Sequence, residues 1–186
     1  MRKVWLVALS SVFVAILPAA GNAALQDENI LLPVPNGFTA GFRGRQGTMD
    51  IQEFVPSSET VKDWSQMVTE QIFHNLGKRD PDQLPQGMSQ TWPSGCPGGE
   101  SQRIARANEN GYEISVWMFV CPNNPATGKP ENMWMKVVSG ADALYSVQYA
   151  YRQPLTKEMV APTMAYLKSV LVCDTRGAEH PCPKGT

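Results

Sequence analysis

Four cysteines carry the most distinctive chemistry in this sequence. They are Cys96, Cys121, Cys173 and Cys182, and no two of them have CxxC spacing. In an exported chain, an even set of cysteines favours disulfides, although more than one pairing is possible. We predict bridges from Cys96 to Cys121 and from Cys173 to Cys182. The first follows from the register of a predicted hairpin, and the second ties down the C-terminal tail.

A metal site near the C-terminus is the alternative to the second bridge. The residue types that bind zinc are present there. They are Cys173, His180 and Cys182, with Asp174 or Glu179 as a further ligand. Because an oxidising compartment works against free thiolates, the sequence favours the disulfide over the metal.

Two methionines on one predicted strand suggest a different metal. Met133 and Met135 flank Trp134, so their thioethers point to the same side of the strand. Thioether sulfur suits Cu(I), and a Met-based copper-binding protein is therefore one alternative function. Methionine is also a flexible filler of hydrophobic cores, and this is the interpretation that we prefer.

No constellation of catalytic residues is recognisable. A Ser-His-Asp arrangement would have to use His74, for which the sequence names no partner, and a histidine at a predicted helix end is typical of a carbonyl cap. Asp50 and Glu53 share a predicted strand but point to opposite faces, which makes them a poor acid and base pair. We expect no enzyme and no cofactor. A periplasmic hydrolase with a dispersed site is the alternative.

The N-terminus has the features of a secretory signal peptide, residues 1–23. A basic start precedes an apolar run over 4–17, and small residues lead to Ala23, after which we place the cleavage site. Cleavage leaves 186 − 23 = 163 residues. This length suits one domain, placed at 24–172, with a disulfide-tied tail at 173–186. We therefore predict a periplasmic protein, with no stable membrane span after cleavage.

The charge balance argues against polyanionic partners. The signal peptide carries two basic residues and no acidic ones, so the mature chain has 16 − 2 = 14 basic and 17 acidic side chains. Nucleic-acid binding and association with an anionic membrane both depend on clustered lysine and arginine. We expect neither.

The clearest structural element is a β-hairpin around an Asn-Gly pair at 110–111. Strand-like runs over 102–108 and 112–121 meet at this pair, which tolerates the positive φ angles of a tight turn. In the simplest register, Cys121 lies opposite Gly98. That position is two residues from Cys96, so a disulfide closes with little movement of the backbone.

The rest of the chain divides into two further hairpins, two helices and a loop. The hairpins pair 37–42 with 49–55 and 133–139 with 143–152, and the helices run from 56–60 to 74–75 and from 156 to 172. Val61, Trp64 and Val68 recur at helical intervals, and Pro162 favours a start of the second helix near Ala161. Prolines and glycines predict an irregular loop over 78–99. Six strands with two packed helices give an α+β class with an antiparallel sheet.

Three short passages and the order of elements resemble a known family. The passages are Gly37-Phe38 with Phe42, Phe54-Val-Pro-Ser-Ser-Glu-Thr60 ahead of Trp64, and Asp142-Ala-Leu-Tyr-Ser-Val147. They resemble the PsbP-like superfamily of small exported proteins, which includes the bacterial DcrB type, over Leu25 to Val172. The resemblance implies binding and assembly roles without a shared catalytic site, so no functional residue is carried over.

We therefore predict a soluble exported binding or accessory protein. Large amphipathic side chains dominate recognition surfaces, and the candidates here are aromatic. They are Trp92, Trp117, Trp134, Tyr149 and Tyr151. They would form one face for a protein partner or a small apolar ligand. The alternative interpretation places them in the core between the sheet and the helices.

Overall fold

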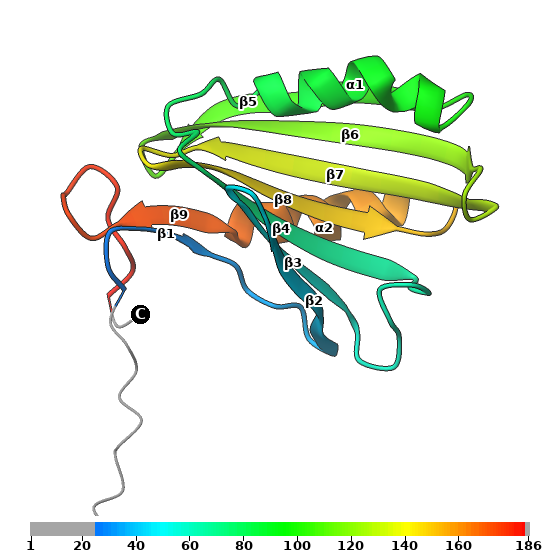
Figure 1. Ribbon diagram of the computed structural model, residues 1–186, viewed down its shortest axis with the longest axis horizontal. Coiled ribbons are helices and arrows are strands. Elements are labelled where there is room, and N and C mark those ends of the chain that lie inside the picture. Colours follow the sequence, from blue (N-terminus) through cyan, green and yellow to red (C-terminus); the bar gives the residue numbers. More distant parts are fainter. Residues whose placement is uncertain (1–24, 185–186) are drawn as a thin grey trace, which may run out of the picture.

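The computed structural model describes residues 25–184, which form an α+β fold around a seven-stranded antiparallel sheet (Figure 1). The strand order is β2-β3-β4-β8-β7-β6-β5, and β1 and β9 form a separate two-stranded ribbon. The strands are β1 (Glu28–Leu31), β2 (Phe38–Gln46), β3 (Met49–Pro56), β4 (Gln66–His74), β5 (Glu100–Glu109), β6 (Tyr112–Asn124), β7 (Lys129–Ser139), β8 (Ala143–Tyr151) and β9 (Leu171–Asp174), and the helices are α1 (Gln83–Gly95) and α2 (Lys157–Ser169). The predicted class is confirmed, but the described residues form nine strands rather than six.

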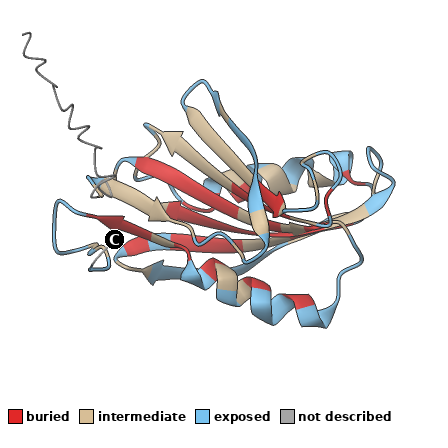
Figure 2. Ribbon diagram, turned by 90° about the horizontal axis from the view of Figure 1, so that it is seen from below, coloured by how far each residue is buried: buried red, intermediate tan, exposed pale blue. Residues whose placement is uncertain are grey.

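The two helices cover opposite faces of the sheet, which we call the α1 face and the α2 face. On the α2 face, Trp134 and Tyr149 pack in one cluster with Leu167 of α2. On the α1 face, Met135 packs in a second cluster with Met88 of α1. Buried residues accordingly gather in the central strands and along the inner side of α2 (Figure 2).

The central hairpin and its disulfide are confirmed. Asn110 and Gly111 form the turn with φ angles of 49° and 82°. The register differs from the prediction because Glu109 pairs with Tyr112 and a bulge follows between Arg103 and Ala105. At the turn, the register differs from the predicted one by two positions, and beyond the bulge it differs by only one. The bridge from Cys96 to Cys121 therefore still closes, with a Cα–Cα distance of 5.7 Å.

The helix predicted from 56–60 to 74–75 is wrong, because Gln66–His74 forms β4. This strand lies inside the sheet, and its first half is buried on both faces: Val68 is 0% exposed on one face, and Met67 is 7% exposed on the other. A strand buried on both faces loses the alternation of apolar and polar residues that identifies strands. Val61 and Trp64, which set up the helical spacing with Val68, precede the strand, so this spacing was misleading.

The irregular loop predicted over 78–99 is also wrong, because it contains α1 (Figure 1). Pro85 lies in the first turn of the helix, where a backbone N–H has no partner within the helix. Pro93 lies in the last turn, and Cys96 donates its N–H to the carbonyl of Trp92 at 2.8 Å. The prolines thus mark the two ends of a helix rather than a loop.

The first and third predicted hairpins are confirmed as β2–β3 and β7–β8. The second predicted helix is confirmed as α2, although it begins at Lys157 and holds Pro162 in its interior, and the chain beyond Val170 becomes β9. Lys136, only 2% exposed, fixes the end of α2 by donating to the carbonyls of Leu167 at 3.0 Å and Val170 at 2.9 Å. It also pairs with Glu109.

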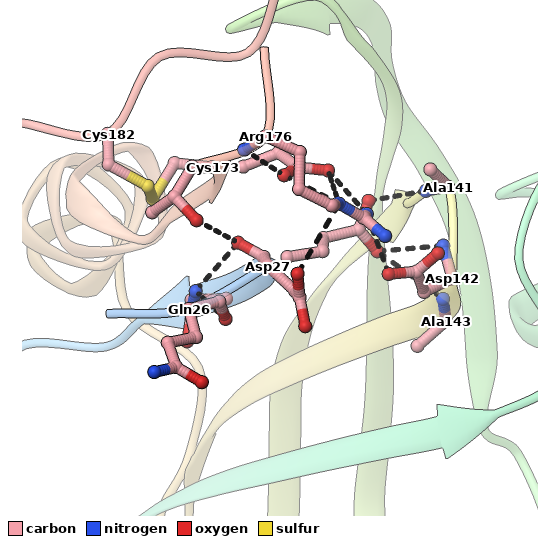
Figure 3. Close-up of polar contacts among 12 residues, drawn as sticks. Gln26, Asp27, Ala141, Asp142, Ala143, Cys173, Arg176 and Cys182 are labelled. Atoms are coloured by element: carbon pink, nitrogen blue, oxygen red, sulfur yellow. Dashed lines mark hydrogen bonds and ion pairs between the residues drawn. A yellow bond between two sulfur atoms is a disulfide. The ribbon is translucent and has the colours of Figure 1, made fainter. Parts of the chain in front are cut away.

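The two ends of the described chain are tied together (Figure 3). The disulfide between Cys173 and Cys182 is confirmed, which excludes the alternative of a metal on these thiols. The Glu28 carboxylate of β1 accepts hydrogen bonds from the N–H groups of the β7–β8 turn, at 3.0 Å from Asp142. Arg176 adds an ion pair to Asp142 at 2.7 Å.

His180, in the same tail, stacks on the ring of Tyr112 with 3.8 Å between centroids. Its Nδ1 lies 2.8 Å from the carbonyl oxygen of Asn110. The tail is thereby held against the turn of the central hairpin. The predicted signal peptide, 1–23, lies outside the described residues. Within 25–184, no helix is long and apolar enough to cross a membrane.

Candidate functional site

A groove, which we call the α1 groove, lies on the α1 face. It consists of two pockets, of about 570 Å³ and 330 Å³, that share Met88 of α1. The larger is lined by Phe73, Leu76, Arg79, Gln83, Leu84, Gly87, Met88, Thr91 and Leu144, and the smaller by Ile51, Glu53, Trp64, Met67, Thr69, Gln71, Met88, Trp92, Glu131, Asn132, Met133, Gln148 and Ala150. Both volumes fall within about 300–1,000 Å³, the usual range for small-molecule sites.

One stripe of α1 forms the apolar wall of the groove. Leu84, Met88 and Trp92 recur at intervals of four residues and therefore share one side of the helix. The ring of Trp92 is fixed because its Nε1 donates to the carbonyl of Val120 at 2.9 Å and its edge meets Phe119, with ring centroids 5.1 Å apart. This wall is packed in place.

A buried carboxylate anchors the N-terminal end of α1. Asp82, 2% exposed, accepts hydrogen bonds from Trp117 Nε1 at 2.8 Å, from Arg103 at 2.7 Å and from Arg106 at 2.9 Å. Burial alone would raise the pKa of Asp82, but these hydrogen bonds outweigh it and hold the pKa below its usual value. Asp82 is therefore charged at neutral pH and binds the helix to β5 and β6.

The disulfide from Cys96 to Cys121 anchors the other end of α1. Cys96 is the C-cap of the helix and Cys121 lies on β6, so the bridge joins helix and sheet directly. The helix is thus held by ions at one end and by a covalent bond at the other. The α1 groove is consequently formed before any ligand arrives, which lowers the entropic cost of binding.

The floor of the smaller pocket is polar. Gln148 of β8 donates to the side-chain oxygen of Gln71 of β4 at 3.0 Å, across neighbouring strands. Thr69 lies beside them and is 8% exposed. Burial raises the pKa of Glu53, whose carboxylate lies on the same floor. Polar groups among apolar walls are what fixes the orientation of a bound ligand.

An aromatic side chain closes the far end of the smaller pocket. Trp64 is 9% exposed, and the guanidinium of Arg152 lies 4.0 Å from its ring centroid. Arg152 is in turn paired with Glu131 at 2.8 Å. The cation–π contact and the ion pair together hold Trp64 over the pocket.

The five predicted aromatic residues do not share one face. Trp134, Tyr149 and Tyr151 lie under α2 and are only 1%, 8% and 6% exposed. Trp92 and Trp117 lie on the α1 face and are partly exposed. The prediction of a single aromatic face is therefore wrong, because alternation along β8 and β7 directs one set inward to α2 and α1 brings Trp92 to the other side.

Of the predicted methionines, Met133 lines the smaller pocket, while Met135 is 0% exposed in the core. Met67 of β4 and Met88 of α1 line the same pocket as Met133. The sequence does not single out Met88, because the prolines and glycines of its segment predict a loop. The four-residue spacing from Leu84 to Trp92 is the signal that would have found it.

His74 ends β4 rather than a helix, and the structure gives it the partner that the sequence did not name. Its Nε2 lies 2.7 Å from the Asp50 carboxylate, which also pairs with Arg45 at 2.9 Å. The hydrogen bond from His74 is the main reason why the pKa of Asp50 is lowered. The two side chains are 39% and 41% exposed. Asp50 and His74 lie on the α2 face, whereas Glu53, which shares β3 with Asp50, lines the α1 groove.

Comparison with known proteins places the fold. No protein-family model matches the chain, and no curated protein sequence is similar to it. Among solved structures, it is similar to LpqN of Mycobacterium tuberculosis, involved in cell envelope biogenesis (14% identity, TM-score 0.38, 82% of this chain and 87% of that one), and to the Saccharomyces cerevisiae Ran-binding protein Mog1p (12%, 0.42, 76% and 85%). At these scores, neither likeness bears on the fold or function of this chain.

A third likeness is stronger. The solution structure of cyanobacterial PsbP (CyanoP) from Synechocystis sp. PCC 6803 matches with a TM-score of 0.52 and 11% identity, over 84% of this chain and 98% of that one. Such low identity is informative about architecture alone. The resemblance drawn from the sequence is therefore confirmed at the level of the fold, and the chain has the fold of cyanobacterial PsbP.

Proposed function

We propose that this protein is an exported binding or accessory protein that holds an apolar ligand, or apolar side chains of a protein partner, in the α1 groove. The observation that carries the proposal is the anchoring of α1 at both ends. A helix held by Asp82 at one end and by the bridge at Cys96 at the other keeps an apolar cavity open. An apolar cavity that stays open beside a sheet is typical of a ligand site.

Binding is better supported than catalysis by the way in which the polar groups are placed. The most convincing titratable pair, Asp50 with His74, lies on the α2 face and is half-exposed, so water competes for it. The α1 groove instead offers thioether, aromatic and aliphatic walls over amide and hydroxyl groups, together with the Glu53 carboxylate and a Glu131 carboxylate that is paired with Arg152. These groups recognise shape and polarity, and they do not supply an activated nucleophile.

The test fills the groove from α1 without disturbing the fold. Gly87 lines the larger pocket, and a Cβ added there meets no atom within 4 Å. Gly87→Phe should therefore place a ring in the cavity, and replacing glycine inside a helix also favours the helix. The matched control is Gly95→Phe, because Gly95 ends the same helix, has equally open space and does not line the groove.

The measurement is a fluorescence titration of the mature protein with the uncharged apolar dye Nile red. We expect Gly87→Phe to weaken binding by about ten-fold or more, since overpacking a cavity costs 1–3 kcal/mol. Gly95→Phe should bind as the unmodified protein does. Equal binding by all three proteins, or no binding by any of them, would remove the basis of the proposal.

A Met-based Cu(I) site is a second candidate, favoured by the three methionines around the smaller pocket. Met67, Met88 and Met133 come from three different elements, and three thioethers are a soft ligand set. Met88→Leu keeps the apolar volume but removes a sulfur. In a Cu(I) titration against a competing chelator, loss of tight binding in this variant supports copper, whereas weak uptake by the unmodified protein refutes it.

Export to the periplasm is part of the same proposal. It is supported by the sequence of residues 1–23 and by two disulfides, which form in oxidising compartments. Mass spectrometry of the protein isolated from its native cell is the test. A chain that begins at Ala24 and carries no free thiol is expected, and an intact leader with four free thiols would contradict export.

A further inference from the structure

An unpaired cation, Arg79, lies beside the larger pocket. Arg79 lines this pocket and is exposed, and its guanidinium forms no ion pair or hydrogen bond with any residue in 25–184. Nearby arginines differ in this respect. Arg106 is paired with Asp80 at 2.9 Å, and both Arg106 and Arg103 bind Asp82. Arg79 thus leaves an uncompensated positive charge beside an apolar cavity.

The opposite end of the α1 groove is acidic. Glu53 lies on the floor of the smaller pocket, forms no hydrogen bond within the described residues and has its pKa raised by burial. Glu131 lies at the same end, where Arg152 neutralises it. An anion is therefore attracted at the Arg79 end of the groove and disfavoured at the Glu53 end. This polarity gives a bound ligand a direction.

Aliphatic and aromatic side chains make up most of the lining of the larger pocket, which also includes Gln83 and Thr91. Leu76, Leu84 and Leu144 surround the larger pocket with Phe73, and Met88 leads on to the smaller one. A peptide threaded here would set its backbone N–H and C=O groups against apolar walls, where unpaired polar groups are costly. A hydrocarbon chain has no such groups. The lining thus favours an acyl chain over a peptide.

We infer that the α1 groove binds an acyl chain with a carboxylate headgroup, with the carboxylate on Arg79 and the chain along α1 toward Met88. Arginine suits this role because its guanidinium offers paired donors that match a carboxylate. Charge complementarity at the mouth and an apolar lining beyond it are the two features that a fatty acid requires. The inference rests on the proposed function and names its ligand class.

The experiment compares two probes of equal chain length by calorimetry on the mature protein. They are dodecanoate, which carries the charge, and dodecan-1-ol, which does not. In Arg79→Gln, dodecanoate should bind about ten-fold more weakly or worse, because a charge-assisted hydrogen bond is lost, while dodecan-1-ol should bind unchanged. The control is Lys168→Gln, an exposed cation in the last turn of α2 on the other face, which should alter neither affinity.

Two further measurements vary the length of the acyl chain and fill the groove with the Gly87→Phe side chain. Each methylene added to the acid should tighten binding by about four-fold until the groove is full, which is the factor expected for one buried methylene. Gly87→Phe should weaken dodecanoate binding, and Gly95→Phe should not. Both results support the acyl chain in the α1 groove. Binding that ignores chain length, or that survives Gly87→Phe, would overturn it.

The outcomes separate this inference from the function on which it rests. If Nile red and dodecan-1-ol bind but Arg79→Gln leaves the affinity for dodecanoate unchanged, the carboxylate site is refuted. The proposal of an apolar binding groove is then retained. If no apolar probe binds, both fall together. If a short apolar peptide with a free C-terminal carboxylate binds more tightly than dodecanoate and depends on Arg79, the acyl chain is refuted in favour of a protein C-terminus.

Discussion

Removing the disulfide at α1 should cost the protein more stability than removing the one in the tail. The bridge from Cys96 to Cys121 spans 25 residues, and the bridge from Cys173 to Cys182 spans 9. The loop-closure relation converts these spans into about 3.5 and about 2.6 kcal/mol of stability. Replacing both cysteines of one bridge by alanine removes it cleanly, so the two double variants serve as controls for each other.

The two variants should also differ at the α1 groove. Without the first bridge, the C-terminal end of α1 is still held by Trp92, which donates to the Val120 carbonyl and packs against Phe119. The wall of the cavity is then less well fixed, so Nile red should bind more weakly. The second bridge lies in the tail, away from the residues that line the groove, and its loss should leave binding unchanged.

Urea unfolding followed by circular dichroism gives the free energy of unfolding of each variant, and the dye titration gives the affinity. We expect a larger loss of stability for the 96–121 variant, by about 0.9 kcal/mol, together with weaker binding. A smaller loss for the 96–121 variant than for the 173–182 variant would show that chain entropy does not govern these bridges. Unchanged dye binding would show that the bridge does not hold the wall.

Three further substitutions test two charged side chains that hold the helices and one carboxylate whose ionisation destabilises the sheet. Asp82→Asn should cost about 3 kcal/mol at neutral pH in urea unfolding, since a buried charge with three donors is lost, and the cost should vanish in acid once the lowered pKa of Asp82 is crossed. Burial raises the pKa of Glu70 despite the nearby Arg43, so its ionisation opposes folding as pH rises; Glu70→Gln should raise the melting temperature at pH 7 and lose this gain as pH falls through the raised pKa. Lys136→Met should cost about 2–3 kcal/mol, because two carbonyls at the end of α2 lose their donor, and an unchanged melting temperature would contradict this.

The parts of the fold that local chemistry specifies could be predicted. The turn at Asn110 and Gly111 needs positive φ angles, and asparagine and glycine are the residue types that adopt them most readily. The bridge from Cys96 to Cys121 followed from this hairpin even though the register was two positions wrong at the turn, because a disulfide tolerates a range of Cα distances.

The parts that depend on neighbours could not be predicted. β4 is a strand because β3 and β8 flank it, and burial on both faces gave Val68 and Met67 the same apolar character. α1 forms among prolines because Asp82 and the bridge at Cys96 hold it to the sheet. Neither cause is local in sequence. The α1 groove lies between β4 and α1, and it could not be predicted because the sequence suggests the wrong structure for both elements.

The pairing of β1 with β9 has a mechanical consequence. Glu28 lies opposite Asp174 at the end of the ribbon where β1 begins and β9 ends. A pull on the C-terminal tail reaches β9 at Cys173, opposite Asn29, through the bridge to Cys182, so a pull on the two ends acts across the ladder and parts its bonds one after another. The Glu28 carboxylate accepts hydrogen bonds from the backbone N–H groups of Ala141 and Asp142, and these bonds resist the separation of the first residue pair of the ribbon. A pull on the two ends would therefore separate β1 from β9 before the force reaches the seven-stranded sheet.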